Sequence, residues 1–188
     1  YDILRCLVGS EMCIRDRHGT YLLAGASLCG GKAYALLEKF FREFVQEATG
    51  QEKPLYKTLE KLAGDGKAFC TGRENRKKLQ IETTFDGTRV HPEQTGSIAN
   101  LSTDNFTPAA FVYGTLEGMS RELYQMYQTI QNGTGMQIKY MIGSGNGLRK
   151  NPVLCEIVEE MFGAKLALAE CEEEAATGAA LSSMQQDE

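Results

Sequence analysis

A glycine-rich turn that leads into a capped helix is the feature that most restricts how this chain can fold. The apolar run at 137–142 is typical of a strand, and it ends in the loop GSGNGLRK at 143–150. Asn151 then provides a cap for an amphipathic helix that should end at Gly163. A second apolar run, KLALA at 165–169, is typical of another strand. The sequence therefore predicts strand, loop, helix and strand in succession.

A strand, a glycine turn and a helix are also expected near the start of the chain. The run YLLAGASL at 21–28 is typical of a buried strand that ends in a tight turn at a glycine pair. A helix should follow and end at Gly50. Phe40 and Phe44 recur on its apolar face, whereas Glu38 should face water.

A long amphipathic helix is expected in the second half of the chain. Apolar residues recur at spacings of three and four from Val112 to Ile130, so the helix should begin at Pro108 and be half buried. Asp104 and Thr107 are both suitable caps. The other expected elements are a helix at 54–63 stopped by the glycines at 64 and 66, a polar surface loop at 67–78, a strand at 79–85 and a small-residue helix at 172–184.

Composition argues against several classes of protein. The 188 residues include 20 Lys plus Arg and 25 Asp plus Glu, a net charge of −5, which argues against a nucleic-acid partner. No stretch approaches the roughly 20 uninterrupted apolar residues of a membrane span, and charges near the start argue against a secretory signal. We therefore expect a cytoplasmic protein without a membrane partner.

The first 17 residues form a separate problem. They show neither helical nor strand periodicity, and LVGSEMCIRDR resembles translated adaptor sequence. We interpret residues 1–17 as a non-native leader and residues 18–188 as one domain, the alternative being a genuine N-terminus.

Few side chains suggest catalysis. No Ser, His and Asp set is apparent, and the acidic residues are best explained as turn residues or as helix caps. The six cysteines include no C-x-x-C pair, and with only His18 and His91 no zinc spacing appears, so buried free thiols are expected. We predict neither a catalytic residue nor a metal ligand in this chain.

The loop at 143–150 is the best candidate for a binding site. A turn without Cβ atoms beside a helix N-terminus can accept an anion or a planar base, although a plain turn is an equal alternative. Leu148 stands where the dinucleotide fingerprint G-x-G-x-x-G requires glycine. The earlier Gly30-Gly31-Lys32 lacks the spacing of a phosphate-binding P-loop.

Three segments together resemble the C-terminal domain of the FGGY carbohydrate kinases: GASLCGGKAYALLEKFF, NFTPAAFVYGTLEGMSRELYQMY and MIGSGNGLRKNPVLCEIVEEMFGAKLALAECEEEAATGAALSS. Within the family, GSGNGLRKNPVL and SIANLSTDNFTP are most similar to the sedoheptulokinases. The resemblance implies an α/β fold of the actin-like ATPase (ribonuclease H-like) type, with a mixed sheet flanked by helices.

The resemblance also implies which residues bind ATP. Gly143, Ser144, Gly145 and Asn146 would flank the adenosine, Asn151 would lie near the adenine, and Gly31 would lie near the phosphates. The sugar, the catalytic Asp and most of the Mg²⁺ site would belong to an N-terminal domain that precedes the matched segment. We therefore expect this chain alone to be inactive, and the complete kinase to phosphorylate a ketose such as sedoheptulose.

Two other classes of function stay open from the sequence. One is a noncatalytic ATP-binding module of the same fold, such as an ATP sensor or a chaperone-like domain. The other is a Rossmann-type oxidoreductase domain, which Leu148 and the absence of an acidic ribose anchor disfavour.

Overall fold

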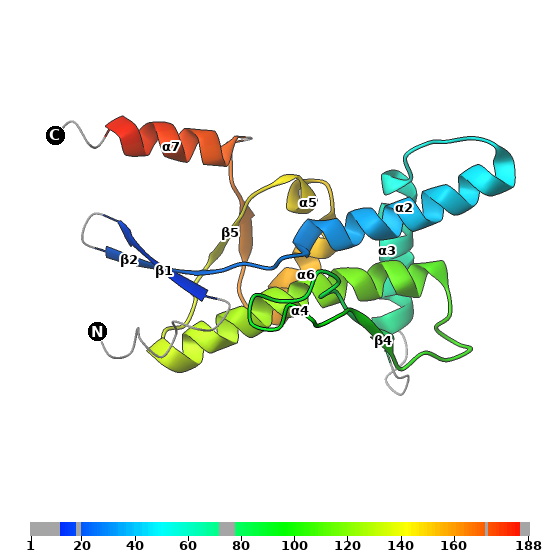
Figure 1. Ribbon diagram of the computed structural model, residues 1–188, viewed down its shortest axis with the longest axis horizontal. Helices are drawn as coiled ribbons and strands as arrows, with labels where there is room; N and C mark the ends of the chain where they lie inside the picture. Colours follow the sequence, from blue (N-terminus) through cyan, green and yellow to red (C-terminus); the bar gives the residue numbers. More distant parts are fainter. Residues whose placement is uncertain (1–11, 18–19, 72–77, 172, 185–188) are drawn as a thin grey trace. The chain divides into compact units, whose positions relative to one another are not determined.

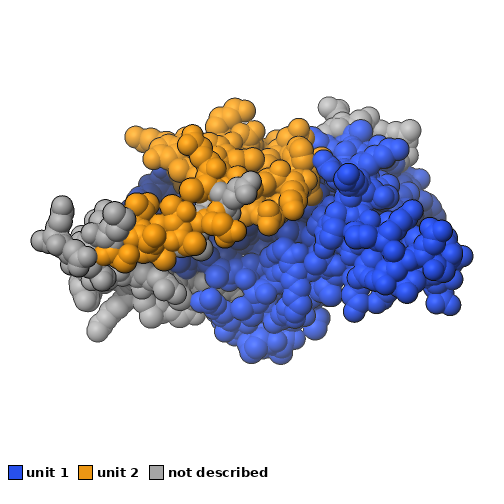
Figure 2. All heavy atoms as spheres, turned by 90° about the horizontal axis from the view of Figure 1, so that it is seen from above, with its two compact units in different colours: residues 1–137 blue, residues 138–188 orange. Residues whose placement is uncertain are grey.

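The computed structural model describes residues 12–17, 20–71, 78–171 and 173–184. It divides into two compact units, residues 1–137 (unit 1) and residues 138–188 (unit 2), which Figure 2 distinguishes by colour. Short strands pair as two antiparallel sheets and one parallel sheet, and helices separate them along the chain (Figure 1). Helices combined with both kinds of sheet agree with the expected mixed α/β class.

The described residues of unit 1 form four strands and three helices: β1 (Met12–Arg17), β2 (Thr20–Gly25), α2 (Gly30–Thr49), α3 (Tyr56–Thr71), β3 (Gln80–Glu82), β4 (Ser97–Ala99) and α4 (Pro108–Thr134). β1 pairs antiparallel with β2 from Met12 opposite Gly25 to Arg17 opposite Thr20. Since the sequence predicted no strand before residue 18, β1 is a difference from that prediction. Cross-strand pairing with β2, rather than periodicity of its own, accounts for β1.

Helix α4 is the centre of unit 1. It begins as predicted at Pro108, and the side chain of Thr107 caps it by accepting a hydrogen bond of 3.2 Å from the backbone N–H of Ala110. Val112 and Leu116 are fully buried within it. Because α2, α3 and β3 all pack against this helix, burial of its apolar residues is the main stabilising contribution in the unit.

Helix α3 corrects the prediction of a stop at the glycines. It continues without interruption through Gly64 and Gly66 to Thr71. A Cβ atom built on Gly66 would lie 2.6 Å from the Cβ of Tyr113 in α4, so glycine allows the two helices to approach closely. The polar loop expected from residue 67 is therefore helical in its first part, because helix packing outweighs the low helix propensity of glycine.

Helix α2 corrects the predicted orientation of its faces. Glu38 is only 4% exposed, whereas Phe40 and Phe44 are 65% and 71% exposed. A carboxylate oxygen of Glu38 accepts a 2.9 Å hydrogen bond from the backbone N–H of Leu55, and its other oxygen accepts from Arg42 at 3.3 Å. These partners compensate the burial of the charge, which periodicity alone cannot anticipate.

In the part of unit 2 that the structure describes there are two strands and three helices: β5 (Met141–Gly143), α5 (Asn146–Arg149), α6 (Pro152–Phe162), β6 (Leu166–Leu168) and α7 (Glu174–Met184). β5 and β6 are parallel, with Met141 opposite Leu166 and Gly143 opposite Leu168. Helix α6 ends at Gly163, which is left-handed with φ of 64°. The predicted succession of strand, loop, helix and strand is confirmed, with a short α5 added inside the loop.

Among the described residues, no helix combines the length and the apolar character needed to cross a membrane.

Candidate functional site

The carboxyl ends of β5 and β6 define the position of the candidate loop. The carbonyl oxygen of Gly143 accepts a 2.8 Å hydrogen bond from the backbone N–H of Ala169. Since the strands are parallel, the loop that follows β5 and the segment that follows β6 both begin at this edge. Ligands of open α/β sheets bind outside the carboxyl ends of the strands.

The three glycines of the loop, at positions 143, 145 and 147, differ in the constraint that the structure places on them. A Cβ on Gly143 would lie 2.8 Å from a methyl group of Leu148, which would have to shift to accommodate it. Gly145 has φ of 92°, a conformation that side chains disfavour. Gly147 has neither constraint, and a Cβ on Gly145 or Gly147 would meet no described atom within 4 Å. The backbone at positions 145 and 147 is therefore open to a planar group approaching from outside.

Asn151 has a structural role at the end of the loop. Its side chain is 5% exposed, and its carbonyl oxygen accepts a 3.1 Å hydrogen bond from the backbone N–H of Leu154. It thereby caps α6, as the sequence predicted. Its expected position near an adenine stays a prediction. Ser144 and Asn146 are both exposed in the same loop.

Several hydrogen bonds hold the loop. Within α5, the backbone N–H groups of Arg149 and Lys150 donate to the carbonyls of Gly145 and Asn146, at 3.2 and 3.1 Å. The thiol of Cys155 donates to the carbonyl of Leu148 at 3.3 Å. In addition, the guanidinium of Arg149 donates to the backbone carbonyl of Cys171, beyond the end of β6. No sequence signal identified this last contact, because its acceptor is a backbone atom 22 residues away.

Gly31 belongs to unit 1, in the first turn of α2. The hydroxyl of Ser27 accepts hydrogen bonds from the backbone N–H groups of Gly30 and Cys29, at 2.8 and 3.2 Å, and so satisfies the start of the helix. A Cβ on Gly31 would meet no described atom within 4 Å. Packing within unit 1 therefore does not explain why this residue is glycine.

A lysine and an aspartate lie beside this turn. The ammonium of Lys32 contacts both carboxylate oxygens of Asp86, at 2.7 and 3.0 Å. The hydrogen bond to Asp86 and its negative charge raise the pKa of Lys32. Lys32 is thus held as a cation against the turn that follows β3.

The structure brings five of the six predicted site residues into one loop: Gly143, Ser144, Gly145, Asn146 and Asn151. The sixth residue, Gly31, lies in the first turn of α2 in unit 1.

The titratable groups of the described residues include no activated nucleophile. Burial raises the pKa of the Cys29, Cys70 and Cys155 thiols, which disfavours the reactive thiolate. All three are free, as is the exposed Cys171. In the part of the chain that the structure describes, no group of three or more His, Cys, Asp or Glu residues could hold a metal ion.

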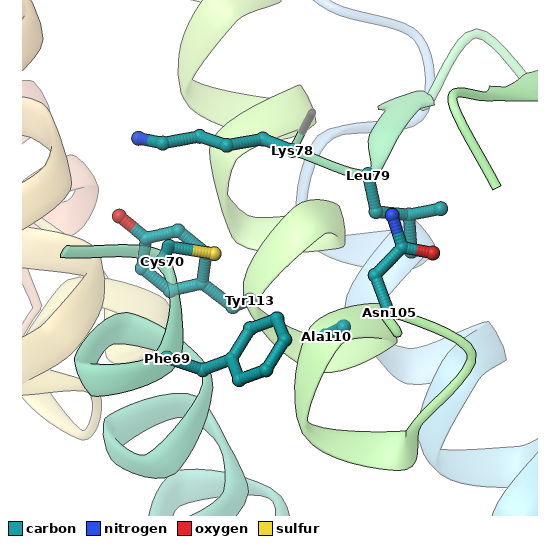
Figure 3. Close-up of a pocket in the computed structure, with 7 residues that line it drawn as sticks. All are labelled: Phe69, Cys70, Lys78, Leu79, Asn105, Ala110 and Tyr113. Atoms are coloured by element: carbon teal, nitrogen blue, oxygen red, sulfur yellow. The ribbon is translucent and has the colours of Figure 1, made fainter. Parts of the chain in front are cut away.

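Two hollows lie elsewhere, in unit 1. A cavity of about 10 Å³ lies between Phe69 and Cys70 of α3 and Tyr113 of α4, as Figure 3 shows, and it has room for about one water molecule. A larger groove of about 460 Å³ lies beside Phe40 and Ile98. Sequence reasoning missed this groove because it assigned Phe40 to a buried face.

Comparisons with known proteins place these features in context. The model of the C-terminal domain of the FGGY family of carbohydrate kinases matches residues 8–185. This match begins inside the stretch interpreted as a leader, which stays a prediction. A comparison with curated protein sequences finds no significant match.

Solved kinase structures have a similar fold. The xylulose kinase from Bifidobacterium adolescentis aligns with a TM-score of 0.69 and 19% identity, over 93% of this chain and 31% of that chain. The glycerol kinase from Plasmodium falciparum, solved with ADP, aligns with a TM-score of 0.63 and 16% identity, over 86% and 29%. The xylulose kinase from Rhodospirillum rubrum aligns with a TM-score of 0.63 and 18% identity, over 85% and 30%. This chain therefore spans about a third of the length of these proteins.

Proposed function

We propose, because the chain belongs to the FGGY family of carbohydrate kinases and matches its C-terminal domain, that it is the nucleotide-binding part of an ATP-dependent sugar kinase. The fold is that of the actin-like ATPases, as the solved kinases show, so the fold class predicted from the sequence is confirmed. Kinases of this family transfer a phosphoryl group from ATP to a carbohydrate hydroxyl.

The observation that carries the proposal is the open backbone at Gly145. This residue follows the carboxyl end of a parallel strand, has φ of 92°, and leads through α5 into a capped helix. A purine and a ribose can lie against a backbone that carries no Cβ atoms. We propose that Gly143, Ser144, Gly145 and Asn146 flank the adenosine.

The family resemblance implies two further nucleotide-binding residues, one in each unit. Asn151 would lie near the adenine, at the end of the loop that it closes by capping α6. Gly31 would lie near the phosphates, because it belongs to the first turn of α2 and backbone N–H groups at a helix N-terminus can bind an anion. Its Cβ position is empty of described atoms, so the room for an approaching phosphate is present.

The sugar and the metal are assigned to a preceding domain that this chain does not contain. We propose a ketose, with sedoheptulose as the first candidate, because GSGNGLRKNPVL and SIANLSTDNFTP resemble that branch of the family. ATP brings the phosphoryl group, and Mg²⁺ would neutralise its developing charge. No cluster among the described residues of this chain fits the metal.

The chain alone should not turn over ATP in the presence of a sugar. Phosphoryl transfer depends on positioning and charge stabilisation from both sides of a cleft, and the base would lie in the preceding domain. Sugar-dependent release of ADP by the 188-residue chain would contradict this assignment of roles.

Nucleotide titration of the full-length kinase tests the proposal directly. Addition of ATP or ADP should shift the backbone amide signals of Gly145 and Gly147, whereas Gly163, at the far end of α6, serves as the control. If the loop amides stay in place while the protein is folded and complete, the assignment of a nucleotide to this loop is wrong.

A further inference from the structure

The loop of the proposed nucleotide site needs support from outside itself. Helix α5 has only four residues, and two of the positions at 144–147 are glycines. A helix of one turn is unstable in isolation, and glycine loses more conformational freedom on ordering than any other residue. The two backbone hydrogen bonds within α5 do not by themselves fix where this turn lies.

Arg149 provides a contact that leaves the loop. It is the last residue of α5, and its guanidinium donates a hydrogen bond to the carbonyl oxygen of Cys171. Cys171 follows β6, so this contact joins the segments that continue from two neighbouring parallel strands. Closer to the strands, a backbone hydrogen bond from Ala169 to Gly143 joins the same two segments.

The acceptor is itself attached to the next element. The thiol of Cys171 lies 3.5 Å from the hydroxyl of Thr177 in α7. Arg149 therefore connects α5 to a segment that is tied to β6 on one side and to α7 on the other. A guanidinium is suited to this role because it is always charged and its donors are fixed in one plane.

We propose that Arg149 is a positioning residue that holds the loop at 143–150 in its nucleotide-binding conformation, an inference that rests on the proposed function. Arg149 acts through the backbone carbonyl of Cys171 rather than on the phosphoryl group. Its loss leaves α6 and the sheet intact but allows α5 to move.

Three variants of the full-length kinase test this role. Arg149→Ala should raise the KM for ATP roughly tenfold, as expected for loss of a charge-assisted hydrogen bond, while the KM for the sugar stays unchanged. Arg149→Lys should recover part of the loss, because an ammonium can still donate to one carbonyl. Lys150→Ala is the matched control: it removes an equal charge from the same loop and should change the KM for ATP less than twofold.

Amide hydrogen exchange separates this inference from the proposed function. In Arg149→Ala the amides of residues 149 and 150 should exchange at least tenfold faster without nucleotide, while the amide of Leu154 in α6 is unaffected. If the parent kinase binds ATP and Arg149→Ala matches it in both KM and exchange, the positioning role is wrong and the proposed function stands. If the parent kinase binds no ATP, both fail. An equal loss in Lys150→Ala would also overturn the inference, because general charge attraction would then explain the effect.

Discussion

Different interactions stabilise the two units of the chain. In unit 1, α4 buries ten of its residues against α2, α3 and β3, whereas in unit 2 α6 buries three. The loop at 143–150 is held instead by backbone hydrogen bonds, the Asn151 cap and Arg149. Apolar burial contributes stability in proportion to the buried area, whereas a surface loop contributes the geometry of a binding site. Substitutions in unit 1 should therefore change stability, and substitutions in the loop should change binding.

The largest effect is expected at Leu116, which is fully buried in α4. Leu116→Ala should lower the free energy of unfolding by about 2–5 kcal/mol, because it removes buried methyl groups and leaves a cavity. Leu123→Ala on the same helix is the control, since Leu123 is 45% exposed. Urea unfolding measures both variants. Equal losses of unfolding free energy in the two variants would contradict the conclusion that burial in α4 stabilises unit 1.

The next effect compares two glycines of α3. Gly66→Ala should destabilise the chain by about 1–3 kcal/mol, since the new methyl group would meet α4. Gly64→Ala meets no described atom within 4 Å and should instead stabilise the helix by up to about 1 kcal/mol. Thermal melts of the pair should move in opposite directions. A stabilised Gly66→Ala would mean that α3 and α4 do not approach as described.

A substitution at Gly145 tests the role of the loop in unit 2. Gly145→Ala forces a side chain into a conformation with φ of 92° and should cost about 1–3 kcal/mol locally, so the ADP affinity should fall about tenfold. Gly147→Ala lacks the backbone penalty. Any loss of ADP affinity in this variant would therefore mean that the new methyl group occupies space that the nucleotide needs. Calorimetric titration with ADP measures both. Unchanged ADP affinity in Gly145→Ala, alongside binding by the parent, would remove the loop from the site.

The smallest effect concerns acid pH. Glu159 in α6 accepts a 2.8 Å hydrogen bond from the backbone N–H of Leu166 and lies 3.5 Å from Lys165, and the bond from Leu166 is the main cause of its lowered pKa. A depressed folded-state pKa stabilises the fold above the unfolded value of about 4.3, and this stabilisation is lost as the pH falls through the folded value.

Glu159→Gln should weaken the pH dependence of the stability of unit 2 in this acid range. The pH dependence of the stability of unit 1 should stay unchanged. The measurement is the amide signal of Leu166, followed between about pH 6 and about pH 3. A titration of that signal that persists in Glu159→Gln would assign the acid sensitivity to another group.

The sequence predicted best the elements whose signals are local. The start of α4 at Pro108 and the end of α6 at Gly163 follow from caps and periodicity, and the structure confirms both. The order of elements around the loop at 143–150 was predicted for the same reason.

The differences arise where distant contacts decide the outcome. Gly66 continues a helix because Tyr113 lies close to it, and Glu38 is buried because Leu55 provides a donor. Neither partner can be recognised from the local pattern. The contact of Arg149 with a backbone carbonyl has no sequence signature at all.

The parallel pair of β5 and β6 has a consequence for how this kinase domain would respond to its substrate. Three paired residues on each strand form a very short ladder, and parallel strands are usually stable only inside wider, covered sheets. Nucleotide bound as proposed would stabilise unit 2: at one hundred times its dissociation constant it would add about 2.7 kcal/mol to the free energy of unfolding. ATP bound at the proposed site should therefore slow the proteolysis of this unit.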